Sequence, residues 1–200
     1  MKVIFATLLI VGFAAALSPK TIINNLKTQL QSDVQTIKTH TKSLVQQVKT
    51  HAQEDVAAIV KNPFAGLGKL IKNLSNDAKD VVTSTVTDTN QVNDHIQAAI
   101  TQLKEVDASK YLPILDTLKE QLKGDAKDAK ATVQELLKQA LGHVGDDVKA
   151  LLTKPIDASK IIQDNWNTDF NKFVTEGQKY VATVQQQVQE ALEKLQQVDQ

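Results

Sequence analysis

Residues 27–59 read KTQLQSDVQTI, KTHTKSLVQQV and KTHAQEDVAAI, three consecutive blocks of eleven residues that align without a gap. Each block begins with Lys-Thr, has Val at its eighth place and ends on Ile or Val. Eleven residues make about three helical turns, so the fourth, eighth and eleventh places lie on one face of a helix. This stretch therefore predicts a long amphipathic α-helix with one apolar stripe.

The same frame continues along the chain from residue 23 to residue 195. At the fourth, eighth and eleventh places 38 of 48 residues are apolar, whereas the whole chain is 42% hydrophobic. Insertions at loops would normally reset such a frame, and no segment has the period-two alternation of a strand. We therefore predict an all-α fold, an elongated bundle of amphipathic helices built on 11-residue repeats.

Prolines and glycines give the expected helix ends. Four prolines divide the chain into segments of similar length, because proline lacks an amide hydrogen and clashes with the preceding turn; they are Pro19, Pro63, Pro113 and Pro155. Glycines and the stretch TDTNQ (87–91) suggest further breaks, the glycines being Gly66, Gly68, Gly124, Gly142, Gly145 and Gly177. Two arrangements remain open: four long arms, or six to eight shorter helices.

The first sixteen residues differ from the rest of the chain. They combine a lysine at position 2 with an apolar run of about ten residues and a final Ala-Ala-Ala. This is the pattern of a secretory signal peptide, and it is short for a membrane span of roughly 20 residues. We expect a signal peptide over 1–16 and an amphipathic helical bundle domain over 17–200, in a secreted, extracellular protein with no transmembrane span.

Composition argues against several classes of function. The 23 basic residues are all lysine and balance 23 acidic ones, which leaves no basic patch for nucleic acid. Without cysteine there is no disulfide scaffold or thiol nucleophile. No HExxH, P-loop or GxSxG pattern is present. His40 and His51 are expected on the polar face of one helix, about 16 Å apart and too far to share one metal, whereas His95 and His143 are interpreted as solvated surface or cap residues. We expect no enzyme activity, cofactor or metal.

The apolar stripe and its border supply the candidate lipid-binding residues. Val34, Val45 and Val56 hold the eighth place of the three opening blocks. The first place of the same blocks is held by Lys27, Lys38 and Lys49. A lysine there can lay its methylene stem on an apolar surface and keep its ammonium in water, as in helices at a lipid interface, although lysine also borders ordinary surface helices. In later blocks the first place becomes apolar, as at Leu137, Val148 and Phe170.

Aromatic residues and one sequon complete the candidates. Trp166, Phe170 and Phe173 follow one another at i, i+4 and i+7 on one helical face. They form either the aromatic centre of the core, or an interfacial anchor or the wall of a small apolar site. Asn73, in Asn-Leu-Ser, is a candidate glycosylation site.

A signal peptide, no cysteine, eleven-residue amphipathic repeats, few aromatics and the tail YVATVQQQVQEALEKLQQ (180–197) occur together in this chain. In these features it resembles the exchangeable apolipoproteins, particularly insect apolipophorin III. The resemblance implies reversible binding to a lipid or lipoprotein surface, as in lipid transport. Two alternatives remain: a helical cavity carrier for fatty acid-like ligands, and a secreted structural protein that self-associates and has no ligand.

Overall fold

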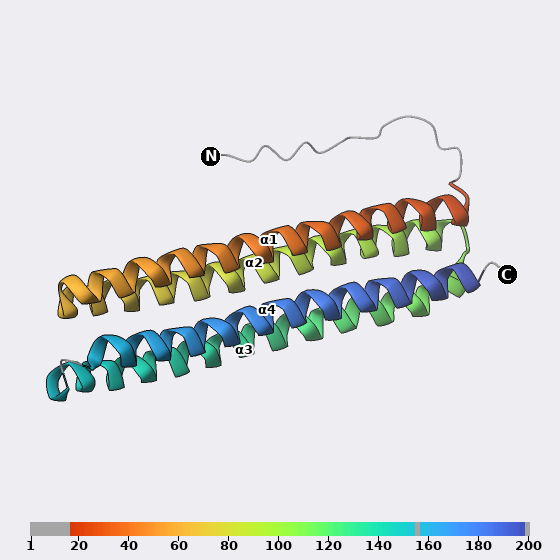
Figure 1. Ribbon diagram of the computed structural model, residues 1–200. Helices are drawn as coiled ribbons and strands as arrows, with labels where there is room; N and C mark the ends of the chain where they lie inside the picture. Colours follow the sequence, from red (N-terminus) through yellow and green to blue (C-terminus); the bar gives the residue numbers. More distant parts are fainter. Residues whose placement is uncertain (1–16, 155–156, 199–200) are drawn as a thin grey trace.

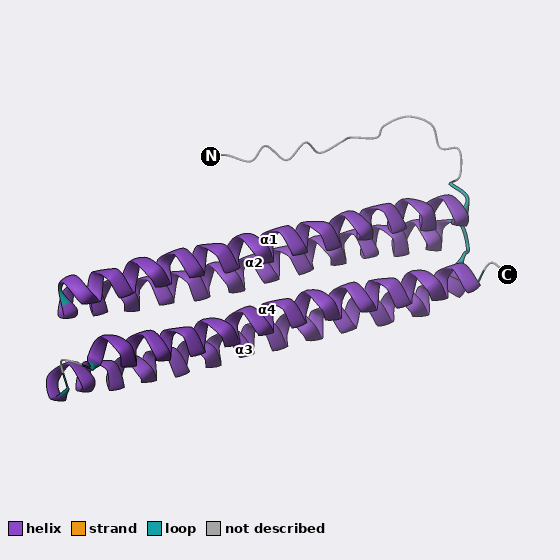
Figure 2. Ribbon diagram, in the orientation of Figure 1, coloured by secondary structure: helices purple, strands orange, loops and turns teal. Residues whose placement is uncertain are grey.

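Four long helices make up the part of the chain that the computed structural model describes, residues 17–154 and 157–198 (Figure 1). The helices are α1 (Pro19–Lys61), α2 (Pro63–Glu105), α3 (Leu112–Thr153) and α4 (Ala158–Gln197), with a short 3-10 helix, η1 (Ser109–Tyr111), before α3. Within these ranges there is no strand (Figure 2). The prediction of an all-α bundle is confirmed, and the helices are four long arms.

The helices form an antiparallel bundle in which each helix packs on two neighbours. α1 packs on α2 and α4, and α3 packs on α2 and α4. The α1–α2 turn, the end of α3 and the start of α4 lie at one end of the bundle, and the start of α1 and the end of α4 lie at the other (Figure 1). None of the described helices is long and apolar enough to cross a membrane. The predicted signal peptide, residues 1–16, lies outside the described residues.

Three prolines stand at helix starts, as predicted. Pro19 and Pro63 are the first residues of α1 and α2, and Pro113 is the second residue of α3. The side chains of Ser18 and Asn62 cap α1 and α2, because each accepts a hydrogen bond from a backbone amide three residues later. The fourth proline, at position 155, falls in the gap between the described ranges.

The glycines do not break the helices, so the interruptions predicted at these positions are wrong. The stretch 87–91 lies inside α2, and all six glycines are helical: Gly66 and Gly68 in α2, Gly124, Gly142 and Gly145 in α3, and Gly177 in α4. A helical glycine costs only about 1 kcal/mol relative to alanine. Ending a helix there would instead leave unpaired backbone groups and lose the packing of the apolar stripe.

The buried core is divided into two clusters along the bundle. The larger cluster, here the terminal core, lies at the end that holds the start of α1 and the end of α4, and includes Ile22, Leu26, Leu30, Val34, Ile37, Ile96, Leu103, Leu115, Leu122 and Leu195. The smaller cluster, here the turn core, lies near the two inter-helix turns and consists of Ile59, Leu67, Leu70, Val144, Ile162 and Trp166. The stretch of bundle between these cores contains the candidate site.

Candidate functional site

The two halves of the bundle repeat one another at a spacing of 92 residues. When residues 18–107 are aligned with 110–199 without a gap, 24 of the 90 positions are identical. Each half is one antiparallel pair of helices, here called hairpin 1 (α1 and α2) and hairpin 2 (α3 and α4). The sequence repeat therefore corresponds to a structural unit, the helical hairpin.

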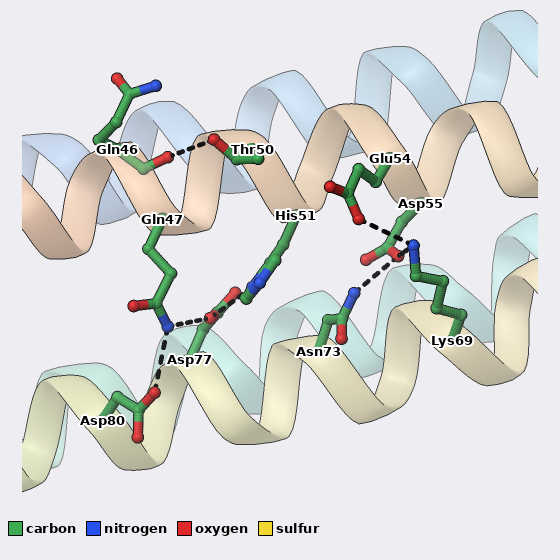
Figure 3. Close-up of polar contacts among 10 residues, drawn as sticks. All are labelled: Gln46, Gln47, Thr50, His51, Glu54, Asp55, Lys69, Asn73, Asp77 and Asp80. Carbon is green, nitrogen blue, oxygen red and sulfur yellow. Dashed lines mark hydrogen bonds and ion pairs between the residues drawn. The ribbon is translucent and has the colours of Figure 1, made fainter. Parts of the chain in front are cut away.

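Buried polar pairs join the two helices of hairpin 1 (Figure 3). His51 Nδ1 on α1 lies 2.8 Å from Asp77 Oδ1 on α2, and Gln47 Nε2 donates to the same oxygen at 3.0 Å. One helical turn further towards the α1–α2 turn, Asn73 Nδ2 donates to Asp55 Oδ1 at 2.8 Å. Asp55 and Asp77 are both buried. Burial raises the pKa of Asp55, and the bond from Asn73 opposes that rise.

Hairpin 2 carries the same pairs at positions shifted by 92 residues. His143 Nδ1 lies 2.8 Å from Asp169 Oδ2, and Asn165 Nδ2 donates to Asp147 Oδ1 at 2.7 Å. Burial raises the pKa of Asp147, and the bond from Asn165 only partly opposes it. The repeated side chains thus hold α4 on α3 as they hold α2 on α1.

All four histidines contact buried or nearly buried carboxylates, so the interpretation of His95 and His143 as solvated surface or cap residues is wrong. In addition to the pairs above, His95 Nδ1 lies 2.7 Å from Asp33 Oδ2, and His40 Nδ1 lies 2.9 Å from Asp88 Oδ1. Each pair joins two helices of one hairpin. Among the described residues, no three His, Cys, Asp or Glu side chains are grouped so that they could hold a metal ion.

A cavity of about 240 Å³ lies between the terminal core and the turn core, and all four helices line it. Towards the turn core the lining is largely apolar and includes Leu44, Val45, Val81, Val133, Leu136 and Phe173, with Ser84 and Glu176 among them. Towards the terminal core it is polar and includes Asp88, Asp125, Asp128, Tyr180 and Thr183. Tyr180 Oη lies 2.8 Å from Thr89 Oγ1, a contact between the two hairpins, and burial raises the pKa of this phenol. The cavity is therefore amphipathic along the bundle axis.

The predicted apolar stripe faces inward in this conformation. Val34 belongs to the terminal core, Val45 lines the cavity and Val56 packs against the turn core. Of the bordering lysines, Lys27 and Lys38 are half-buried, whereas Lys49 is exposed.

The aromatic stripe also faces inward. Trp166 lies in the turn core, Phe173 lines the cavity, and Phe170 is half-buried between them. Asn73, the candidate glycosylation residue, uses the nitrogen to which a glycan would attach for its bond to Asp55. A glycan on Asn73 would therefore require that bond to break.

Exposed apolar side chains at the turn end were not among the sequence candidates. Val60 is 65% exposed, and Phe64 and Leu152 are each 67% exposed. We call these three residues the apolar tip. Val60 and Leu152 are equivalent in the 92-residue repeat. All three lie off the fourth, eighth and eleventh places of the frame, and this departure from the stripe was the signal that could have identified them.

Comparisons of the chain with protein-family models, with curated proteins and with solved structures gave no match.

Proposed function

We propose that this is a secreted, non-enzymatic protein that binds lipid or other apolar surfaces reversibly, as in lipid transport. The observation that carries the proposal is the apolar tip. Val60 and Phe64 lie at the α1–α2 turn and Leu152 lies near the end of α3, at the same end of the bundle, with Phe64 and Leu152 each two-thirds exposed. Burying one such side chain contributes about 1.5–3 kcal/mol. The tip therefore offers a first point of contact with an apolar surface.

The distribution of polar contacts supports opening of the bundle into two hairpins. The histidine–aspartate and asparagine–aspartate pairs lie within hairpins, whereas the terminal core is shared by all four helices. The cavity interrupts the packing between hairpins midway along the bundle. Separation of the hairpins would keep these pairs, break the Thr89–Tyr180 contact and exchange apolar contacts between hairpins for apolar contacts with lipid. Such an exchange has a small net free energy, as reversible binding requires.

The open hairpins would present the predicted lipid-binding residues. Hairpin 1 would expose Val34, Val45 and Val56, and hairpin 2 would expose Trp166, Phe170 and Phe173. The lysines at positions 27, 38 and 49 would border the stripe at the lipid–water boundary. An eleven-residue period keeps a stripe on one side of a nearly straight helix, which lets each arm lie flat. This behaviour is what the resemblance to exchangeable apolipoproteins implies.

Of the alternatives, a cavity carrier is favoured by one observation, the central cavity. Its polar end, however, contains the carboxyl groups of Asp88, Asp125 and Asp128, which disfavour the carboxylate of a fatty acid. Self-association without a ligand is the interpretation that would remain if lipid had no effect on the protein. Addition of the protein to turbid phosphatidylcholine vesicles separates these functions: surface binding predicts clearing, higher helicity and a shift in Trp166 emission.

Removing the apolar tip is expected to slow vesicle clearing without loss of stability. The variant is Phe64→Ser combined with Leu152→Ser, both at exposed positions. The variant loses part of the free energy that two such side chains contribute when they are buried in lipid. We expect clearing to be about tenfold slower as a result. The matched control is Val86→Ser with Leu141→Ser, which removes two exposed apolar side chains away from the tip. Equal clearing rates for the two double variants would contradict the role of the tip.

A further inference from the structure

The central cavity coincides with two positions at which hairpin 2 has smaller residues than hairpin 1. Ala129 stands where hairpin 1 has Ile37, and Gly177 stands where it has Thr85. Ile37 is buried in the terminal core, whereas Ala129 and Gly177 both line the cavity. The volume that the Ile37 side chain fills in hairpin 1 is therefore part of the cavity in hairpin 2.

The polar end of the cavity is acidic. Asp88 on α2 and Asp125 on α3 line it from opposite hairpins. Asp88 contacts His40, and Asp125 is hydrogen-bonded to Gln187. Oδ2 of Asp125 is nevertheless buried and has no hydrogen-bond partner among the described residues. Burial raises the pKa of both carboxyl groups. This is expected where hydrogen bonds and nearby cations do not fully offset the cost of burying a carboxylate.

Other charged groups around the cavity leave this acidic character unchanged. Lys179 and Glu176 also line it, but their charged groups lie 3.7 Å apart and offset one another. Asp128 adds a further carboxyl group on α3. The net charge that the lining presents to a ligand is therefore negative.

The opposite end fixes the shape and size of the occupant. Aliphatic side chains and Phe173 make up most of its lining, with Ser84 and Glu176 beside them. A cavity of ~150 Å³ accommodates benzene, so about 240 Å³ leaves room for roughly ten non-hydrogen atoms. An occupant that fits both ends has a short apolar body and a single polar head.

We propose that this cavity is a binding site for a small amphiphilic amine, with its apolar chain against the aliphatic lining and its ammonium group at the acidic end, beside Oδ2 of Asp125. An ammonium group supplies the donor that Oδ2 of Asp125 lacks and the positive charge that the lining favours. A fatty acid of the same length would place a further carboxylate among the aspartates. The inference is independent of lipid-surface binding, because the cavity is lined within the closed bundle.

Three probes of equal chain length test the head group: n-octylamine, n-octanol and n-octanoate, each titrated into the full chain by calorimetry at neutral pH. We expect saturable binding of one n-octylamine per chain, at least tenfold tighter than n-octanoate, with n-octanol between them. A tenfold difference is the effect of one charge-assisted hydrogen bond. Absence of n-octylamine binding, or n-octanoate binding of equal strength, would overturn the proposal.

Two variants locate the binding in the cavity. Ala129→Ile restores the residue of hairpin 1 and fills the space, so n-octylamine affinity should fall more than tenfold. Ala182→Ile, the same change at an exposed position of α4 outside the lining, should bind as the wild type does. Asp125→Asn should weaken n-octylamine about tenfold and leave n-octanol unchanged. Circular dichroism shows whether Ala129→Ile folds. If it does not fold, the Asp125→Asn variant tests the site alone, and an n-octylamine affinity equal to that of the wild type would refute the proposal.

Discussion

A disulfide between the hairpins is expected to abolish vesicle clearing. A Cβ atom added at Gly177 on α4 would lie 3.4 Å from Cγ2 of Thr41 on α1. A cysteine at position 41 can place its Sγ where Cγ2 now lies, so Thr41→Cys and Gly177→Cys bring two thiols within reach of a disulfide. The bridge would join the hairpins midway along the bundle, about 33 Å of helix from the start of α1 at 1.5 Å per residue. If lipid binding requires the hairpins to separate, the oxidised protein keeps its apolar stripe inside and vesicles stay turbid.

The chain itself supplies clean controls for this experiment. It has no cysteine, so the two introduced thiols are the only ones. Reduction of the same variant should restore clearing, which separates the bridge from the substitutions. A short bis-maleimide link between Gln139→Cys and Lys172→Cys would tie α3 to α4, whose side chains already approach at this pair; this link within hairpin 2 should leave clearing intact. Equal clearing by the oxidised and reduced forms would show that the hairpins need not separate.

The stripe and the helix starts could be predicted from the sequence because both are local. The eighth-place valines of residues 27–59 face inward, and three prolines stand at helix starts. The lengths of the helices could not be predicted from local rules. Gly124 and Gly177 are weak helix formers, but each is held inside a helix of about forty residues by packing along its whole length. Whether a helix continues through a glycine is therefore decided by the free energy of tertiary packing.

The repeat of hairpins also explains an irregularity in the eleven-residue frame. Eight blocks of eleven are 88 residues, so a spacing of 92 shifts hairpin 2 by four places, about one helical turn. Residues at the eighth place of hairpin 1 correspond to the first place in hairpin 2. Val45 and Val56 therefore have Leu137 and Val148 as equivalents. The apolar residues at the first place of the later blocks are thus the same stripe in a shifted frame.

The polar pairs had a signal in the sequence that periodicity alone could not interpret. Among the eleventh places of the frame, the exceptions to the apolar rule are Asp125, Asp147 and Asp169. In the structure Asp147 and Asp169 are bound by Asn165 and His143, and Asp125 lies at the cavity. The partners of these carboxylates come from the facing helix. Which residue pairs with each carboxylate depends on the register between the two helices. The periodicity of a single helix gives no information about that register.

Replacing Asp147 by asparagine is expected to raise the free energy of unfolding by about 1 kcal/mol at neutral pH. Asp147 is 2% exposed, and burial raises the pKa of its carboxyl group. A carboxyl group with a raised pKa contributes stability that is complete below the unfolded-state pKa, about 3.9, and is lost as the pH rises through the folded-state pKa. Asparagine does not ionise, so urea unfolding at pH 7 should show the gain and unfolding near pH 4 should not.

The equivalent carboxyl group of hairpin 1 provides the matched control. Asp55 is also buried and also accepts a bond from an asparagine, but Lys69 Nζ lies 3.9 Å from its Oδ1. At the position of Lys69, hairpin 2 has Ile161. Asp55→Asn removes a carboxylate with a nearby cation, and Asp147→Asn removes one without it, so the gain at pH 7 should be smaller for Asp55→Asn. A loss of stability in Asp147→Asn at pH 7 would instead mean that His143 stabilises the Asp147 carboxylate by more than burial costs.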